Sequence, residues 1–389
     1  MRIALVYDGV YPYSVGGGEK IFHDLARHLA PRHEVFLLGL HLWDGPAEMD
    51  VAPNVRLIGI CRPAARNTLQ AGDARSLKQA LRFAAWTFRA LKRLGHLDLI
   101  DCMATPYFPL YAAYWRARLD RVPLASTWLE LWSLADWRAY VGSGPKARLA
   151  WQIEHFATKL PRHIISISPQ TSEALAGRDV SSDRLSTITP WADIAAIDAI
   201  APDDHPCDLL FAGRLIQSKG VHLLIEALAL LREAMPGVRC RIVGDGPERA
   251  RLETRVHELG LGGNMLFSGF LDSHAAVVAA MKASRVFVLP SSREGFGIVV
   301  VEAAACGVPC VTIDAPNNAA RNLVRAAGAG AVCGAEPAAL SEALLAQLRL
   351  GDHERAGASA RVRAWAKDYD WPARASAYEE IYDRIARDG

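Results

Sequence analysis

The sequence predicts an α/β protein made of two doubly wound, Rossmann-like domains in tandem. The first observation behind this prediction is length, since 389 residues exceed the roughly 100–200 residues of a usual domain. The second is a regular alternation of short apolar runs with longer segments of helical periodicity, which is typical of parallel sheets covered by helices. We expect an N-terminal domain over residues 1–190, a C-terminal domain over 191–370, and a final helix over 371–389 that crosses back to the first domain.

The first half contains six apolar runs with the character of strands. The chain opens with "RIALVYD" at 2–8, and a Gly-rich loop, "SVGGGEK" at 14–20, follows. The loop leads into a helix that carries Ile21, Leu25 and Leu29 at helical spacing. Further helices are expected at 75–94 and 146–160, and further strands at 34–40, 55–60, 97–103, 122–128 and 163–168.

The alternation restarts in the second half after a stretch rich in chain breakers. Residues 187–206, with Pro190, Pro202 and Pro206, have the mixed character of a linker. Ligands of doubly wound sheets bind beyond the carboxyl ends of the strands, so we expect the active site in a cleft between the two domains. Strands are expected at 207–214, 238–246, 265–270, 285–292 and 309–315.

Composition argues against several classes of function. The net charge of +2 and the lack of any base-reading motif argue against nucleic-acid binding. Residues 1–190 hold 23 Lys or Arg against 17 Asp or Glu, so the first half should meet anions more readily, although ordinary scatter explains the difference equally well. The seven cysteines are dispersed and form no C-x-x-C pair, which favours reduced thiols over disulfides or metal ligands.

The termini and apolar runs predict the compartment. The N-terminus lacks the apolar length of a signal peptide. No run approaches the ~20 apolar residues that are needed to cross a bilayer. We therefore expect a cytoplasmic protein, at most peripheral at the inner face of the membrane.

The most informative stretch is "VFVLPSSREGFGIVVVEAAACGVPCV" at 286–311. A buried strand is expected to end at Pro290, and a helix to start near Gly297. Glycines 295 and 297 allow a ligand to approach the backbone, and free amides at the helix start favour a phosphate. Glu294 and Glu302 would repel that phosphate, so they suit the hydroxyl groups of a sugar and a ribose. The alternative is that both are ordinary solvated acids.

A second motif supplies positive charge. In "FAGRLIQSKGVHLLIEAL" at 211–228, a strand ends at Gly213, and Arg214 and Lys219 flank the start of the next helix. Cations placed there would clamp a pyrophosphate through charge-assisted bonds of roughly 1.5–3 kcal/mol each. A solvated lysine in a loop is the alternative.

Four segments resemble the motifs of family 4 of the retaining glycosyltransferases. They are "GRLIQSKG", "VGDGPERARLE", "FSGFL" and "REGFGIVVVEAAACGVP", and the E-x7-E spacing of Glu294 and Glu302 matches the family's signature. The resemblance extends over nearly the whole second half. It implies two facing Rossmann-like domains, the B-type (GT-B) glycosyltransferase fold, and catalysis without a metal.

The resemblance also implies roles for individual residues. Arg214 and Lys219 would bind the diphosphate and stabilise the leaving nucleotide, and with Glu294, which would hold hydroxyls of the transferred sugar, they are the candidate catalytic residues. Glu302 would bind the ribose. The sugar and phosphate pocket would be lined by Gly213 and the backbone of Gly295, Phe296, Gly297, Ile298 and Val299, and the nucleobase would lie near Gly244, Asp245, Gly246, Phe270 and Leu271.

The physical logic of glycosyl transfer agrees with these roles. The transition state is oxocarbenium-like, and negative charge grows on the leaving diphosphate. Positive groups aimed at that charge act as an oxyanion hole does. A metal would do the same, but no D-x-D or histidine cluster is placed to hold one, and "PDDHP" at 202–206 lies in the expected linker.

In the first half, the Gly-rich loop resembles the family's loop before its first helix. It matches neither a Walker A loop nor a G-x-G-x-x-G fingerprint. Gly16 and Gly17 would bring backbone amides near the donor phosphates and the acceptor; a plain turn is the alternative.

The acceptor side departs from the family pattern. Members commonly carry a histidine directly after the equivalent of Trp128, whereas this chain has Leu129, followed by Glu130. The usual active-site histidine is therefore replaced by a leucine at this position. Many members also place a glutamate near Arg321.

Two further features of the first half have both a functional and a structural interpretation. Trp128, Trp132 and Trp137 could stack on an acceptor sugar, although core packing is the more frequent use of tryptophan. The helix at 75–94 has an apolar stripe flanked by basic residues, which suits either an acidic membrane or ordinary packing on a sheet. The stripe is expected to consist of Leu77, Leu81, Ala84, Phe88 and Leu91.

We therefore expect a retaining hexosyltransferase that uses a UDP- or GDP-sugar, with UDP preferred, and no cofactor or metal. The acceptor would be a glycan, a lipid-linked saccharide or a small molecule. The alternatives are a sugar-nucleotide-binding protein that has lost transfer, motivated by Leu129, and a sugar-nucleotide epimerase, which the E-x7-E context disfavours.

Overall fold

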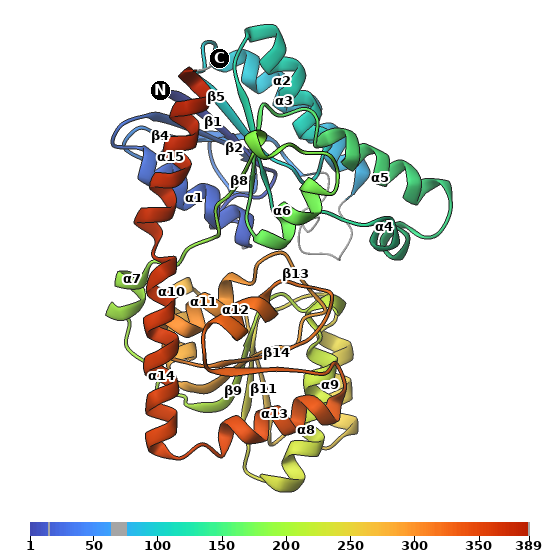
Figure 1. Cartoon of the computed structure of the whole chain (residues 1–389), viewed down its shortest axis with the longest axis vertical. Coiled ribbons are helices and arrows are strands. Elements are labelled where there is room, and N and C mark those ends of the chain that lie inside the picture. The colour runs from blue at the N-terminus through green and yellow to red at the C-terminus, as the bar shows by residue number, and fades with distance from the viewer. Residues whose placement is uncertain (15, 64–75, 388–389) are drawn as a thin grey trace. The chain divides into compact units, whose positions relative to one another are not determined.

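The computed structural model describes residues 1–14, 16–63 and 76–387. The chain forms two compact units, and it passes from the first to the second between Pro190 and Trp191 and returns between Trp371 and Pro372. Of the expected features, the loop residue Val15 and the helix start at Arg75 lie outside the described residues. Each unit is a sheet with helices on both faces (Figure 1), which confirms the predicted fold class.

The first unit is built on an eight-stranded sheet. Its strand order is β3-β4-β2-β1-β5-β6-β7-β8. The strands pair in parallel except for β3, which runs antiparallel to β4 at one edge. The edge strands β3 and β8 are additions to the six predicted strands. The bounds are β1 (Arg2–Val6), β2 (Glu34–Leu40), β3 (Glu48–Ala52), β4 (Val55–Cys61), β5 (Leu99–Met103), β6 (Leu124–Trp128), β7 (His163–Ser166) and β8 (Leu185–Thr187).

Alternate side chains of these strands bury against different helices. Val6, Ile100 and Trp128 face a core that is shared with residues of α2, α3 and α5. Asp101 and Thr127, one position out of step, are buried on the opposite face, where Asp101 accepts a hydrogen bond from Tyr382 of α15. The helices of this unit are α1 (Gly17–Leu29), α2 (Leu77–Leu94), α3 (Phe108–Asp120), α4 (Leu134–Val141), α5 (Pro145–Ala157), α6 (Pro169–Ala176) and α15 (Trp371–Arg387).

The buried stripe of α2 differs from the prediction. The helix packs through Ala80, Phe83 and Ala84, together with Thr87 and Leu91, whereas the predicted stripe began at Leu77 and Leu81. Both of these leucines are exposed. The two stripes are about one residue out of phase, and apolar residues on both sides of the helix made the phase ambiguous in the sequence.

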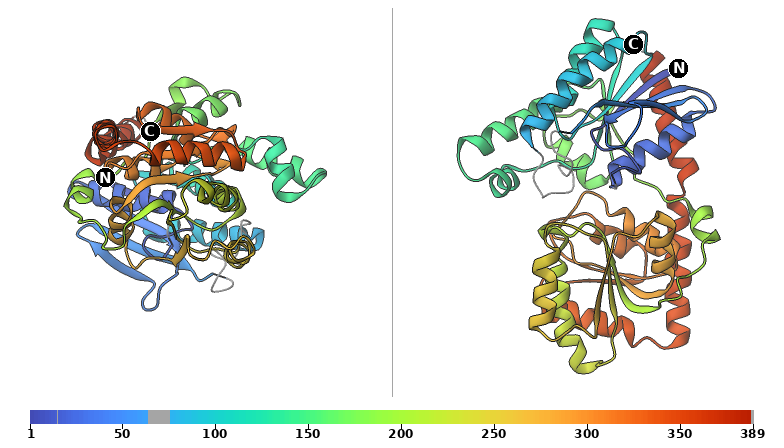
Figure 2. Two further views of the ribbon diagram at one scale, coloured as in Figure 1. Left: turned by 90° about the horizontal axis from the view of Figure 1, so that it is seen from below. Right: turned by 180° about the vertical axis from the view of Figure 1, so that it is seen from behind.

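The second unit is built on a six-stranded parallel sheet in the order β11-β10-β9-β12-β14-β16. A separate two-stranded pair, β13-β15, lies beyond the carboxyl end of β12 in the chain. Helices α8, α9 and α13 pack together, and α11 packs with α10, α12 and α14 (Figures 1 and 2). The strands are β9 (Cys207–Ala212), β10 (Cys240–Val243), β11 (Met265–Gly269), β12 (Ser284–Leu289), β13 (Arg293–Glu294), β14 (Cys310–Ile313), β15 (Asn317–Asn318) and β16 (Gly330–Cys333), and the helices are α7 (Ile194–Ala199), α8 (Val221–Ala234), α9 (Arg249–Glu258), α10 (His274–Lys282), α11 (Ile298–Ala305), α12 (Ala320–Ala326), α13 (Pro337–Leu348) and α14 (Asp352–Ala366).

The stretch at 187–206 is more ordered than the predicted linker. Trp191 and Ile197 are buried, and Ile197 lies in α7. Asp203 forms an ion pair with Arg241 of β10 at 2.7 Å. The prolines that suggested a linker separate the two units at Pro190, but the residues after it have apolar and charged partners in the second unit.

The C-terminal helix α15 belongs to the first unit. Tyr378 and Tyr382 are fully buried. At the helix surface, the Arg32 guanidinium donates a hydrogen bond of 2.6 Å to the Glu379 carboxylate. Within the described ranges, no helix combines the length and apolar character that a membrane span requires.

Candidate functional site

The carboxyl ends of β9, β10 and β11 are joined by close backbone contacts. The amide of Gly213 donates to the carbonyl of Val243 at 3.0 Å, and the amide of Gly244 donates to the carbonyl of Gly269 at 2.7 Å. A Cβ atom on Gly244, whose φ is +124°, would lie 2.0 Å from the Gly213 carbonyl oxygen. Only glycine fits there, so these strand ends present backbone rather than side chains to a ligand.

Two loops of the second unit are held together beside these strand ends. The backbone carbonyl of Ser218 accepts a hydrogen bond from the Ser292 amide at 2.9 Å and another from the Ser292 hydroxyl at 3.2 Å. A Cβ atom on Gly220 would lie 2.0 Å from the Pro290 carbonyl oxygen. The loop after β9 and the loop after β12 therefore form one rigid corner.

This corner brings together Lys219 and Glu294, which are 75 positions apart. Lys219 Nζ donates to Glu294 Oε1 at 2.6 Å, and the two side chains are 23% and 10% exposed. Glu294 is fixed from the other side, because β13 pairs with β15 and the Glu294 carbonyl accepts from the Ala319 amide at 2.9 Å. Arg214, at the start of the same corner, is exposed.

Helix α11 begins directly after this corner. Gly297 is its N-cap with φ +92°, and a Cβ atom there would lie 2.6 Å from Cβ of Ala320. The amides at the first turn of a helix have no partner within the helix, so Ile298 and Val299 present donors near Glu294 in the chain. The ring of Phe296 is buried and contacts the Tyr369 ring, at 6.0 Å between centroids, so only the backbone of Phe296 is available to a ligand.

Glu302 has a partner that the sequence did not reveal. His274 Nε2 lies 2.8 Å from Glu302 Oε1, and the carboxylate is 6% exposed. His274 is the first residue of α10, directly after the N-cap Ser273, whose hydroxyl accepts from the Ala276 amide. The only signal in the sequence was Ser273, which follows Asp272, since a serine N-cap fixes where the helix starts.

The carboxylate of Asp245 is hydrogen-bonded to residues that are close to it in the sequence. Its carboxylate accepts from Arg249 at 2.9 Å and from the Gly246 amide at 2.7 Å. Phe270, by contrast, is 59% exposed, and Leu271 is half-buried. An exposed aromatic ring at the end of a strand offers a surface on which a planar base can stack.

In the first unit, the Gly-rich loop caps helix α1. Gly16 is the N-cap, and a Cβ atom on it would lie 2.5 Å from a carboxylate oxygen of Glu19. Gly17 has no described atom within 4 Å of such a Cβ position, so its backbone is open. Glu19, which the sequence did not single out, therefore occupies the N-terminal turn beside Gly16.

Leu129 lies next to this helix start. A Cβ atom on Gly18 would be 3.1 Å from Cδ1 of Leu129, so the leucine packs where an imidazole was expected. Glu130, the next residue, is half-buried. Trp128 is 0% exposed and lies in the core of the first unit, so a sugar-stacking role for its ring is wrong. Alternation along β6 places its side chain inside the protein.

Trp132 and Trp137 surround a buried carboxylate. The Trp132 amide and the Trp137 indole donate to Glu154 at 2.9 and 3.1 Å, and Tyr107 donates at 2.5 Å. Burial raises the pKa of Glu154, although these hydrogen bonds and Arg178 partly offset the effect. Both tryptophans are half-buried, so packing around Glu154 accounts for much of their surface.

Three further groups that the sequence analysis considered are metal ligands, the cysteines and Arg321. The described residues contain no cluster of three or more His, Cys, Asp or Glu side chains suited to a metal. The cysteine thiols are unpaired, and burial raises the pKa of Cys61, for example, to about 11. Arg321, where a glutamate was expected by resemblance, pairs with Asp314.

Comparisons with known proteins show which families and folds this chain resembles. A family model described as Glycosyltransferase Family 4 matches residues 15–196, and one described as Glycosyl transferases group 1 matches 195–363. A glycogen synthase from Mycobacterium tuberculosis is 28% identical over 98% of this chain and 94% of its own. A phosphatidyl-myo-inositol mannosyltransferase from Mycobacterium leprae is 35% identical over 46% of this chain and 47% of its own.

Solved structures show the same fold. A sucrose-phosphate synthase from Thermosynechococcus elongatus superposes with a TM-score of 0.80 at 22% identity, and each chain is covered completely. The Anabaena protein HepE, solved in complex with UDP and glucose, gives a TM-score of 0.72 at 20% identity over 99% of this chain and 100% of its own. The chain thus has the GT-B fold and is a glycosyltransferase. It belongs to glycosyltransferase family 4.

Proposed function

We propose that this enzyme transfers a hexose-type sugar from a nucleotide-sugar, preferably a UDP-sugar, to a hydroxyl group with retention of anomeric configuration. The observation that carries the proposal is the Lys219–Glu294 pair, held at 2.6 Å by two interlocked loops beside the start of α11. The structures of HepE with UDP and with UDP-glucose support the choice of UDP, because that protein shares the fold.

The diphosphate would bind between the positive groups and the helix start. An ammonium has three donors, and one of those of Lys219 is used by Glu294. Two remain for phosphate oxygens, together with the exposed guanidinium of Arg214 and the first amides of α11. Glu294, oriented by Lys219, would accept hydrogen bonds from hydroxyls of the transferred sugar.

The nucleoside would bind on the other side of α11. His274 holds Oε1 of Glu302, which leaves Oε2 for a ribose hydroxyl. The exposed ring of Phe270 would stack on the base, and such stacking contributes about 1–3 kcal/mol. The glycines at the ends of β9 and β10 would allow the nucleotide to approach the backbone.

The reaction requires no general base from the protein in this proposal. The bond between the anomeric carbon and the diphosphate oxygen breaks, and the acceptor oxygen bonds to the same face of that carbon. The acceptor's proton passes to an oxygen of the leaving diphosphate. Arg214 and Lys219 stabilise the charge on that group, which is why we propose that catalysis is independent of a metal.

The acceptor would be a glycan, a lipid-linked saccharide or a small molecule. In the first unit, Leu129 places an apolar side chain beside the start of α1 where an imidazole was expected. An apolar contact lowers the number of hydrogen bonds that the acceptor can receive there, so we expect transfer to be slower than donor binding would suggest.

The test is a panel of UDP-, GDP- and dTDP-sugars, measured first by thermal shift and then by transfer or donor hydrolysis. The preferred donor should raise the Tm progressively with concentration. Glu294→Ala and Lys219→Ala should each lower kcat/KM by about 10- to 150-fold, since each loses a charge-assisted bond of about 1.5–3 kcal/mol. Arg251→Ala, which changes an exposed arginine of α9, is the control.

Three outcomes would contradict parts of the proposal. If no nucleotide-sugar binds, the donor class is wrong. If both alanine variants keep full turnover, the site is elsewhere, and if product NMR shows an inverted anomer, the reaction is not retaining. Tight binding without transfer or hydrolysis would instead indicate a sugar-nucleotide-binding protein.

A further inference from the structure

Three helices of the first unit form one outer layer. Residues of α2, α3 and α5 share the core on the same face of the sheet, as Phe83, Leu110 and Ala157 show. The Arg116 guanidinium of α3 lies 5.5 Å from the Phe88 ring of α2, and the Tyr111 hydroxyl of α3 donates to the Ile153 carbonyl of α5 at 2.8 Å. The sides of these helices that point away from the sheet therefore lie next to one another, and we call them the outer face.

The outer face exposes large apolar side chains. Leu149 and Phe156 of α5 are 58% and 55% exposed, and Trp115 and Leu119 of α3 are 60% and 64% exposed. Together with Leu77, Leu81 and Trp86 of α2, these make seven of the thirteen exposed large hydrophobic residues in the described part of the chain. Such a concentration on one face is unusual for a surface that meets only water.

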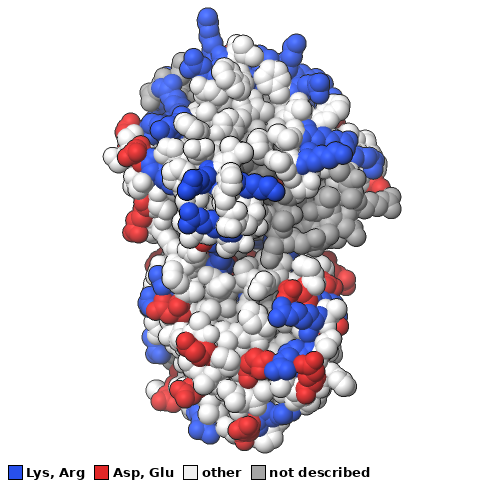
Figure 3. All heavy atoms as spheres, turned by 90° about the vertical axis from the view of Figure 1, so that its right-hand side faces the viewer, with Lys and Arg blue, Asp and Glu red and all other residues white. Residues whose placement is uncertain are grey.

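The charges among these apolar side chains are almost entirely positive. The described parts of α2, α3 and α5 contain two carboxylates, of which Asp120 is paired with Arg116 and Glu154 is buried. Exposed basic residues on these helices are Lys78, Arg82, Arg89, Lys92, Arg93, Arg118, Lys146 and Arg148, of which Arg93 is paired with Glu48 of β3. In Figure 3, Lys and Arg gather among uncharged side chains over the first unit, whereas acidic and basic side chains are mixed over the second.

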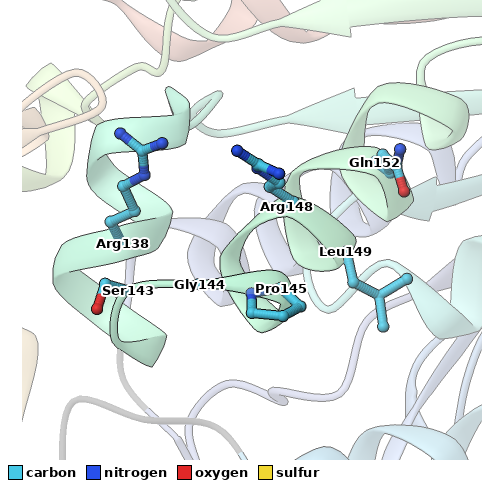
Figure 4. A pocket seen from close by; sticks show the side chains of 7 residues that line it. All are labelled: Arg138, Ser143, Gly144, Pro145, Arg148, Leu149 and Gln152. Atoms are coloured by element: carbon cyan, nitrogen blue, oxygen red, sulfur yellow. The ribbon is translucent and has the colours of Figure 1, made fainter.

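Helix α5 shows the pattern most clearly. Arg148, Leu149, Gln152 and Phe156 recur at helical spacing on its exposed side. Between α4 and α5 the surface is hollowed by about 660 Å³, and Arg138 and Arg148 lie on the two sides of this hollow (Figure 4). Among the described residues, neither guanidinium has a hydrogen-bond or ion-pair partner.

We propose that the outer face docks onto the surface of a membrane that contains anionic lipids. The apolar side chains would enter the boundary between headgroups and acyl chains, and the guanidiniums of Arg138 and Arg148 would bind lipid phosphates. A protein partner fits less well, because lysine is depleted from the centre of protein interfaces, whereas Lys78, Lys92 and Lys146 are exposed among these apolar side chains. This docking does not depend on the identity of the donor sugar.

Co-sedimentation of the full chain with vesicles tests the proposal. Vesicles of phosphatidylcholine with phosphatidylglycerol should bind the protein, vesicles of phosphatidylcholine alone should bind it far less, and salt should weaken binding. Leu149→Gln with Phe156→Gln should lower the partition coefficient at least about tenfold. Arg138→Gln and Arg148→Gln should each lower it about fivefold.

The control is Leu230→Gln with Leu266→Gln, two exposed leucines of the second unit. This variant should bind vesicles as the unchanged protein does, and donor hydrolysis in the absence of vesicles should be unaffected in all variants. Equal binding to both kinds of vesicle, no binding to either, or equal losses in the control and the α5 variant would overturn the proposal. Tryptophan fluorescence gives a second measurement, since Trp115 should shift to the blue on binding anionic vesicles and not neutral ones.

Discussion

Asp101→Asn should change how the stability of the first unit depends on pH. Asp101 lies at the centre of the sheet with 0% exposure, and its Oδ2 accepts hydrogen bonds from Tyr382 at 2.5 Å and Thr127 at 2.8 Å. Burial raises the pKa of Asp101 from 3.8 to about 6, although these hydrogen bonds lower it in part. The amide oxygen of an asparagine can accept the same two hydrogen bonds without ever carrying a charge.

The size of this pH effect on stability follows from the raised pKa of Asp101. Between about pH 4 and pH 6 the folded protein binds a proton on Asp101 that the unfolded chain has lost, so the contribution of this residue to stability falls as pH rises. The rise of the Asp101 pKa from 3.8 to about 6 corresponds to about 3 kcal/mol of stability, which is fully lost above about pH 7. The free energy of unfolding of Asp101→Asn, relative to the unchanged protein, should therefore rise by about 2 kcal/mol between pH 4.5 and pH 8.

Urea unfolding at a series of pH values, followed by circular dichroism, measures this difference. Glu380→Gln is the matched control, because it makes the same chemical change on the exposed side of α15 and should leave the pH profile unchanged. If the difference in unfolding free energy between Asp101→Asn and the unchanged protein stays constant from pH 4.5 to pH 8, then Asp101 does not make stability depend on pH in this range. Such a constant difference would reflect only the free-energy cost of burying the amide nitrogen of the asparagine.

Further changes test the proposed donor site of the second unit and Leu129 of the first. His274→Ala should weaken UDP binding about fivefold, because the histidine orients Glu302 toward the ribose. Binding of a UDP analogue that lacks the ribose hydroxyl should stay nearly unchanged. Isothermal titration measures both affinities, and equal losses for the two ligands would contradict this role. Gly244→Ala should lower the free energy of unfolding by roughly 3 kcal/mol or more, or abolish folding, because its Cβ atom would lie 2.0 Å from a carbonyl oxygen. Gly237→Ala is the control, because its Cβ atom would meet no described atom, and a thermal melt should show that it is tolerated. Leu129→His should raise kcat for transfer while KM for the donor stays the same, and an unchanged kcat would show that an imidazole has no role in this chain.

The second unit was the more predictable from sequence. Its motifs are short and local, so the loops around Lys219 and Glu294 could be placed by the breakers that surround them. Their meeting required the Ser218–Ser292 contacts, which spacing does not reveal. His274 was missed because its partner is 28 positions away on another helix, and a lone histidine at a helix start has no pattern of its own.

In the first unit it was harder to predict from the sequence which apolar side chains are buried. Trp128 is the last residue of β6, whose alternation places its side chain inside, yet its position beside Leu129 in a functional motif suggested a surface. The phase of α2 was missed for a related reason, since Leu77 and Leu81 look like core residues but remain exposed. Apolar type alone does not distinguish a residue that packs from one that faces outward.

The place of α15 has a consequence for how the chain is made. Among the residues that the structure describes, the first unit is assembled from segments that end at Pro190 and resume at Pro372, whereas the second runs from Trp191 to Trp371 without a break. During synthesis, the second unit can complete its core before α15 leaves the ribosome, while the side of the first sheet that carries Asp101 stays open until the final helix arrives. Tyr378 and Tyr382 are made after the whole second unit, and both are fully buried, with the Tyr382 hydroxyl donating to Asp101. The core of the first unit is therefore completed only after all of the second unit has been made.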